Sequence, residues 1–188
     1  MVAIFHTKTI TKREIDEKLK VSGDYVKMDF LSACLKKQMD FDTKKFVLLK
    51  LAEVYEQRKM FSEAGKMIRA AAEINSTYDG KMSDFIKAGE LFIKGANFDD
   101  GDNSFIKALG SATELQKAMV KNARKEAYKA KAKEFLDREK RSSALVAYEK
   151  LLNLDLNPVE KREVQSNLLM IYEKLGKIKE YYNLKAGM

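Results

Sequence analysis

The acidic run from Asp99 to Asn103, with three aspartates around a glycine, is the first stretch that could do chemistry. Closely spaced carboxylates suit calcium, but an EF-hand loop needs glycine at its sixth position and glutamate at its twelfth. Counted from Asp99, the glycine is third and the twelfth residue is Gly110, so the spacing argues against a calcium loop. We expect instead a turn whose carboxylates cap a helix that begins at Asn103, because anions are favourable at the positive end of a helix.

Two other reactive side chains have no partners of the right type. His6 is the single histidine, whereas a catalytic triad or a zinc site needs further groups. Cys34 is the single cysteine, so we expect no disulfide within the chain, a small buried side chain, and a reducing, cytoplasmic compartment. No glycine-rich phosphate loop of the common types occurs. The sequence therefore predicts a protein without catalytic activity, metal or cofactor.

A row of lysines recurs every four residues from Lys117 to Lys133, in a chain whose net charge is +8. On a helix this row would form a basic stripe about 24 Å long. It has three interpretations: a solvated surface, a site for an acidic protein partner, or a contact with a nucleic-acid backbone or with lipid. Aromatic residues for base stacking are scarce, since Tyr128 alone lies within the row. The candidate stripe comprises Lys117, Lys121, Arg124, Lys125, Lys129 and Lys133.

Helices are the elements that must position these side chains. One proline and nine glycines in 188 residues leave long stretches free to be helical. Two segments with apolar residues at helical spacing are joined by the short polar stretch 57–60, which predicts an antiparallel helix pair. The first segment contains Leu48, Leu51, Ala52 and Tyr55, and the second contains Ala64, Ile68 and Ala71.

This pattern recurs around a large apolar anchor residue. A small residue precedes the anchor by three positions, and small, large and apolar residues follow it by nine, thirteen and sixteen. Self-similarity with such a period is typical of stacked helical repeats. We therefore expect an all-α superhelix, a solenoid of about five antiparallel helix pairs, as one domain over residues 11–188 after an irregular segment 1–10. The full pattern surrounds the anchors Tyr55, Phe92 and Phe135, and two flanking copies around Leu19 and Tyr172 fit it loosely. The five anchors are separated by 36, 37, 43 and 37 residues.

The boundaries of several helices can be predicted as well. Thr11 with Glu14 forms a capping box, and Asn157 before Pro158 opens the last repeat. Gly23 and Gly176 lie at helix junctions, where we expect left-handed turns. The longer step of 43 residues predicts one long helix over 113–138 that overhangs its neighbours by one or two turns.

These positions resemble the tetratricopeptide repeat family, although the steps exceed the family period of 34 and no tryptophan is present. The longer steps are similar to those of SNAP-type vesicle-trafficking adaptors. The residues that carry the resemblance are Ala52, Tyr55, Phe61, Ala64, Ile68 and Ala71; Gly89, Phe92, Gly101, Phe105 and Ala108; and Ala132, Phe135, Ala144 and Tyr148.

The resemblance implies a scaffold whose concave face, lined by the first helix of each pair, holds a partner segment. Positions that clamp a peptide carboxylate in some subfamilies hold Glu17, Glu53, Glu90 and Lys133, so a carboxylate clamp is not implied. The candidate concave residues are Arg13, Glu17, Lys20, Glu53, Gln57, Glu90, Lys94, Lys129, Lys133, Arg162 and Ser166.

We therefore expect a non-catalytic adaptor that binds a protein or peptide partner, with an acidic partner as one option. The alternative is a nucleic-acid- or ribonucleoprotein-associated module that uses the basic helix 113–138. Leu175, Ile178 and Tyr182 would leave an apolar edge at the last repeat that could form a homodimer. We expect neither a membrane span nor a signal peptide, since the apolar runs are too short.

Overall fold

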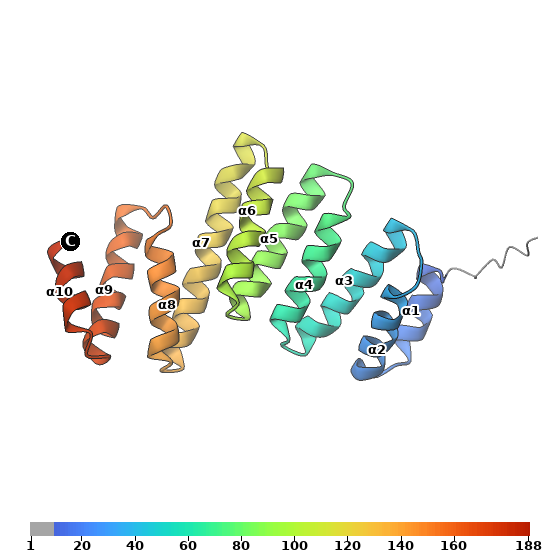
Figure 1. Ribbon diagram of the computed structural model, residues 1–188, viewed down its shortest axis with the longest axis horizontal. Helices are drawn as coiled ribbons and strands as arrows, with labels where there is room; N and C mark the ends of the chain where they lie inside the picture. The colour runs from blue at the N-terminus through green and yellow to red at the C-terminus, as the bar shows by residue number, and fades with distance from the viewer. Residues whose placement is uncertain (1–9) are drawn as a thin grey trace, which may run out of the picture.

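The computed structural model describes residues 10–188, so His6 and the expected irregular segment, apart from its last residue, lie outside the described residues. Over residues 10–188 the chain forms ten α-helices and no strand, arranged as one elongated row (Figure 1). This confirms the predicted all-α helical array. The helices are α1 (Lys12–Lys20), α2 (Asp24–Leu35), α3 (Phe41–Gln57), α4 (Phe61–Glu73), α5 (Tyr78–Lys94), α6 (Phe98–Ser111), α7 (Glu114–Asp137), α8 (Arg141–Leu152), α9 (Pro158–Lys174) and α10 (Ile178–Ala186).

Consecutive helices pack against each other from α2 to α10, and α5 also contacts α7. We call α3, α5, α7 and α9 the first helices, and α4, α6, α8 and α10 the second helices. The N-terminal pair differs from the rest, because α1 packs against α3 more than against α2.

Four first helices end in the same turn, placed four residues after each anchor. The turn residues Lys59, Ala96, Glu139 and Gly176 all have left-handed backbones, with φ between 53° and 66°. The next N–H donates to the anchor carbonyl over 2.8 or 2.9 Å, which is the Schellman arrangement that closes a helix end. The left-handed turn predicted at Gly176 is confirmed. The one predicted at Gly23 is wrong, because Gly23 precedes α2 with an extended backbone (φ −72°, ψ 161°).

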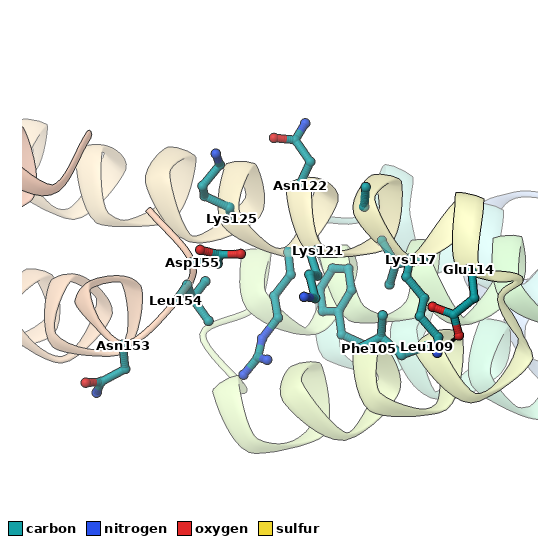
Figure 2. A pocket seen from close by; sticks show the side chains of 13 residues that line it. Phe105, Leu109, Glu114, Lys117, Lys121, Asn122, Lys125, Asn153, Leu154 and Asp155 are labelled. Atoms are coloured by element: carbon teal, nitrogen blue, oxygen red, sulfur yellow. Dashed lines mark hydrogen bonds and ion pairs between the residues drawn. The ribbon is translucent and has the colours of Figure 1, made fainter. Parts of the chain in front are cut away.

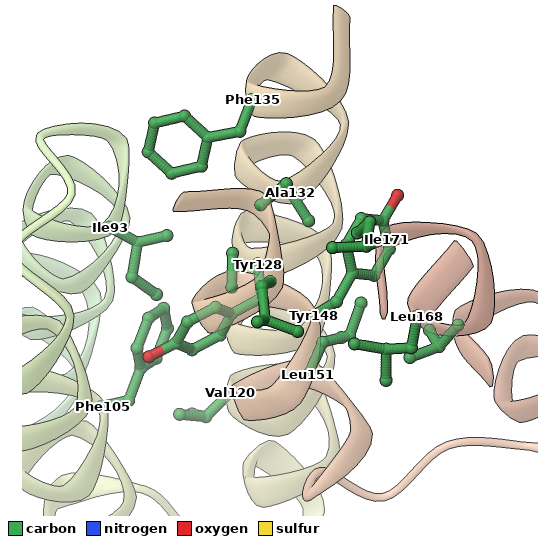
Figure 3. Packing of buried hydrophobic residues seen from close by; sticks show 14 of the residues in the cluster. Ile93, Phe105, Val120, Tyr128, Ala132, Phe135, Tyr148, Leu151, Leu168 and Ile171 are labelled. Atoms are coloured by element: carbon green, nitrogen blue, oxygen red, sulfur yellow. The ribbon is translucent and has the colours of Figure 1, made fainter. Parts of the chain in front are cut away.

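The repeat residues form the core in the order of size that the sequence predicts. Phe92 and Phe105 are fully buried, and Gly89 must be small because a Cβ there would lie 2.7 Å from the Phe105 ring. Gly101 is constrained in the same way by Ile93, at 2.8 Å. The largest apolar cluster lies around α7, where Tyr128 extends towards Phe105 of α6 (Figure 3).

Most of the predicted helix boundaries are confirmed, including the long helix α7, which has 24 residues and Thr113 as its cap. The capping boxes at Thr11 and Asn157 are also present. The predicted turn over the acidic run is wrong, because α6 already begins at Phe98 behind the cap Asn97. Gly101 is therefore a packing residue within the helix and does not break it.

Candidate functional site

The predicted concave residues lie on exposed or half-exposed parts of α1 and of the first helices. Seven of them line three separate grooves. We call the surface that contains these grooves the first-helix face. Arg13, Glu17, Arg162 and Ser166 are exposed but line none of the three grooves. The grooves are lined by Lys20, Glu53 and Gln57 (about 240 Å³), by Glu90 and Lys94 (about 370 Å³), and by Lys129 and Lys133 (about 470 Å³).

The groove between α5 and α7 has a floor of small residues, with alanines at 123, 127 and 130 on one side of α7. Lys131 joins the two helices at the edge of this groove. Its buried ammonium donates to the carbonyl of Lys94 over 2.8 Å and to Glu134 over 3.1 Å. Burial raises the pKa of Glu90 despite the opposing charge of Lys87. The groove can therefore hold a segment that approaches α7 closely.

The groove between α7 and α9 lies over the second helix α8. Its apolar part consists of Leu136, Leu151 and Val164 together with the ring of Tyr148. Asp137, Glu126 and Glu163 stand beside Lys129 and Lys133 in the same lining. Sequence reasoning placed Tyr148 in the core and did not consider Asp137 or Glu163 as site residues. Nothing in the repeat pattern indicated that these three residues share a groove.

The basic stripe is largely neutralised by ion pairs. Lys117 pairs with Glu114 at 2.5 Å, and Arg124 pairs with Asp102 at 2.8 Å. Lys125 and Lys129 both lie 2.8 Å from Glu160 of α9. The hydrogen bond from Lys125, which has the largest effect, and the one from Lys129 lower the pKa of Glu160 to about 2.

Lys121 and Lys133 are the two stripe residues without an ion pair to another described residue. The free charge of the stripe is therefore much smaller than the row of lysines suggests. This matters for the partner, because an acidic protein or a nucleic acid would have to compete with carboxylates already bound to the stripe.

A hollow of about 630 Å³ lies beside the N-terminal half of α7 (Figure 2). Leu109 of α6 and Leu154, in the loop after α8, line its apolar part. It exists because α7 is longer than the other first helices, so that α8 covers only the C-terminal part of α7. Its cations are Lys117, Lys121, Arg124 and Lys125, and among them Lys121 alone has no ion pair with another residue of the range 10–188.

The aspartates of the acidic run bind cations from three other helices. Asp100 accepts a hydrogen bond from Arg69 of α4 over 2.5 Å. Asp102 accepts from Arg124 of α7 over 2.8 Å and from Lys150 of α8 over 2.9 Å. Burial opposes the ionisation of Asp102, but hydrogen bonds and neighbouring charges outweigh it and lower its pKa. Among residues 10–188, no group of three His, Cys, Asp or Glu side chains is placed to hold a metal ion.

The sequence also predicted a buried cysteine, an apolar C-terminal edge and the absence of a membrane span. Cys34 is buried, as predicted, and burial raises the pKa of its thiol. At the C-terminal edge, Ile178 and Tyr182 are 68% and 63% exposed, whereas Leu175 packs partly against the core. Within the described part of the chain, no helix is both long enough and apolar enough to cross a membrane.

The fold and its grooves define a helical-repeat protein of the solenoid type. No protein-family model matches the chain, and no curated protein matches its sequence. Among solved structures, the chain is similar to the crystal structure of BtubC (BKLC) from P. vanneervenii. The two share 16% sequence identity over 91% of this chain and 74% of that chain, with a TM-score of 0.38.

Proposed function

We propose that this chain is a tetratricopeptide-like, non-catalytic scaffold of the cytoplasm that holds a segment of a partner protein along its first-helix face. One observation carries the proposal. Seven residues chosen by repeat alignment alone, from Lys20 to Lys133, line three grooves along this face. A row of shallow grooves suits an extended or helical protein segment better than a small molecule, which is normally enclosed by its pocket.

The nucleic-acid alternative has weaker support. A protein that binds a phosphate backbone releases counterions through lysines and arginines that are free to reach the phosphates. In the stripe of α7, Lys125 and Lys129 are already engaged by Glu160, and Arg124 by Asp102. The alternative therefore rests on Lys121, Lys133 and lysines outside the stripe.

A capture experiment from native lysate tests the proposal. The protein is immobilised as wild type and as the charge-reversal variant Glu53→Lys, Glu90→Lys, Lys133→Glu, which changes one residue in each groove. The control variant Asn103→Lys, Lys179→Glu alters exposed positions of the second helices. We expect a set of proteins that wild type and control retain and that the groove variant loses.

Nuclease treatment and a salt series separate the two functions. Partners of a protein-binding scaffold remain after nuclease treatment, whereas binding to nucleic acid falls log-linearly with salt concentration. The scaffold proposal fails if the groove variant retains the same proteins as wild type. It also fails if all captured material disappears after nuclease treatment.

A further inference from the structure

Three tyrosines of the described part of the chain are more than nine-tenths buried, and the hydroxyl of one of them has no hydrogen-bond partner there. Tyr128 donates to Asp102 over 2.8 Å, and Tyr172 donates to Glu149 over 3.0 Å. Tyr148 is 6% exposed, and no hydrogen bond joins its hydroxyl to any residue in the range 10–188. Buried tyrosine hydroxyls normally find a partner. No fully buried polar side-chain atom of residues 10–188 lacks a partner, so the unpartnered Tyr148 hydroxyl is reached by solvent, at the groove that Tyr148 lines.

The hydroxyl of Tyr148 is not required for packing at its position in the repeat. The equivalent residues of the two preceding second helices are Ile68 and Phe105, which have no polar atom in the side chain. Both are buried in the core. A phenylalanine would therefore fill the same space at residue 148, and the hydroxyl adds a polar group that the core does not use.

Two carboxylates without ion pairs lie in the same groove as Tyr148. Asp137 ends α7 and Glu163 belongs to α9, and neither has a cationic partner among the described residues. Burial is the main cause of the raised pKa of Tyr148, and the negative charges of Glu163 and Asp137 raise this pKa further. Both carboxylates are thus close enough to the hydroxyl to disfavour a third negative charge.

The surroundings of these groups favour a cation with an apolar stem. Leu136 and Ala130 supply accessible apolar surface in a groove of about 470 Å³, above the buried Leu151 and Val164. Of the two lysines in the lining, Lys129 is engaged by Glu126 and Glu160. Lys133 lies one turn before Asp137 on α7 and forms no ion pair with it. The unpaired charges of the groove are therefore two carboxylates against one ammonium.

From this geometry we infer that the groove between α7 and α9 recognises a lysine or arginine side chain of the partner protein. The aliphatic stem packs on Leu136 and Ala130, as the stems of long basic side chains commonly pack on apolar surface. Asp137 and Glu163 accept hydrogen bonds from the cationic head group. The Tyr148 hydroxyl accepts another N–H of the head group or donates to one of the carboxylates. This inference rests on the proposed function and specifies the chemistry of the partner, which would be basic at this point.

Binding of defined peptide pools tests the inference. The probes are short, fluorescently labelled peptides of random sequence, with the central residue fixed as Lys, Arg, Leu or Glu. Fluorescence anisotropy measures their affinity for the wild-type protein. We expect the Lys and Arg pools to bind more tightly than the Leu pool, and the Glu pool to bind most weakly.

Matched variants assign that preference to the groove. The double variant Asp137→Asn, Glu163→Gln should weaken the Lys and Arg pools about fivefold to tenfold and leave the Leu pool unchanged, because two exposed ion pairs are lost. Tyr148→Phe should weaken the Lys and Arg pools about twofold to threefold. The control Asp155→Asn, Glu173→Gln removes the same charge elsewhere and should leave every pool unchanged. Circular dichroism melts check that each variant is folded.

The outcomes distinguish this inference from the scaffold proposal. If wild type binds the pools without preferring Lys or Arg, or if the preference survives in the double variant, the basic-residue inference is overturned and the scaffold proposal stands. If wild type binds none of the pools and captures no protein that depends on the grooves, both are overturned.

Discussion

The phenolic hydroxyl of Tyr128 donates a hydrogen bond to Asp102 over 2.8 Å and thereby joins α7 to the beginning of α6. Arg124 and Lys150 donate to the same carboxylate, so residues of α6, α7 and α8 meet at one group. This point lies where the spacing of the anchors changes from 37 to 43 residues. The network therefore fixes the packing of the array at its most irregular step.

Replacement of Asp102 by alanine should destabilise the protein by about 3 kcal/mol, because the buried Tyr128 hydroxyl and the partly buried Arg124 lose their acceptor. Lys150 would keep only its pair with Asp99. Urea unfolding followed by circular dichroism measures the change. The control is Asp99→Ala, since the Asp99 side chain is 92% exposed and its pair with Lys150 should contribute little. Equal midpoints for the two variants would show that the network is not structural.

The buried tyrosines should respond differently to loss of the hydroxyl. Tyr128→Phe and Tyr172→Phe each remove a hydrogen bond to a carboxylate and should cost about 1.5 kcal/mol or more. Tyr148→Phe removes no hydrogen bond within the described structure, so its unfolding midpoint should equal or exceed that of wild type. Thermal and urea unfolding of the three variants provide the comparison. A loss at Tyr148 as large as at Tyr172 would reveal a partner within the protein.

Glycine should stabilise the turns between first and second helices. Lys59 and Glu139 are held in the left-handed region, which costs about 1 kcal/mol for a residue with a side chain. Lys59→Gly and Glu139→Gly should therefore raise stability by up to about 1 kcal/mol, and Gly176→Ala should lower it by a similar amount. Glu139→Ala is the control, since it removes the charge but keeps the strain. The explanation fails if alanine and glycine at residue 139 give the same stability.

Stability should fall in acid as Glu160 is protonated. Its pKa is about 2 in the folded protein, against 4.5 for a free glutamate, because Lys125 and Lys129 hydrogen-bond the ionised form. A pKa lowered by folding means that the stabilisation is complete above 4.5 and is lost as the pH falls from there to about 2. Melting temperatures measured across this range should fall less steeply for Glu160→Gln than for wild type. Parallel curves would contradict this role of Glu160.

The C-terminal edge predicts weak self-association. Ile178 and Tyr182 are both exposed on α10, and no other helix of residues 10–188 covers them. Sedimentation equilibrium at high protein concentration should show a dimer that Ile178→Lys, Tyr182→Lys abolishes, because buried charges oppose an apolar interface. The double change Val21→Lys, Val26→Lys at the opposite end of the array is the control. A monomer at all concentrations would rule out this edge as an interface.

The sequence predicted the helical repeats because each repeat depends on the spacing and size of residues that are close together in the chain. Ala52, Gly89 and Ala132 are small for the same reason, as each stands where another helix approaches. The long helix α7 and the caps at Thr11, Thr113 and Asn157 also depend on neighbouring residues, so they could be predicted from sequence. The turn at Glu139 could not, because a charged residue gives no sign of a left-handed backbone.

What the chain by itself determined is thus the succession of amphipathic helices and the face that each buries. Only the tertiary structure decided which charges meet, since Glu160 lies 35 residues beyond Lys125 in the chain, and Lys150 lies 48 residues beyond Asp102. The same holds for the groove in which Tyr148, Asp137 and Glu163 come together from three helices. Such contacts depend on the crossing angles and offsets of the packed helices. Small differences in side-chain volume set these angles and offsets cooperatively, so the local spacing of residues does not encode them.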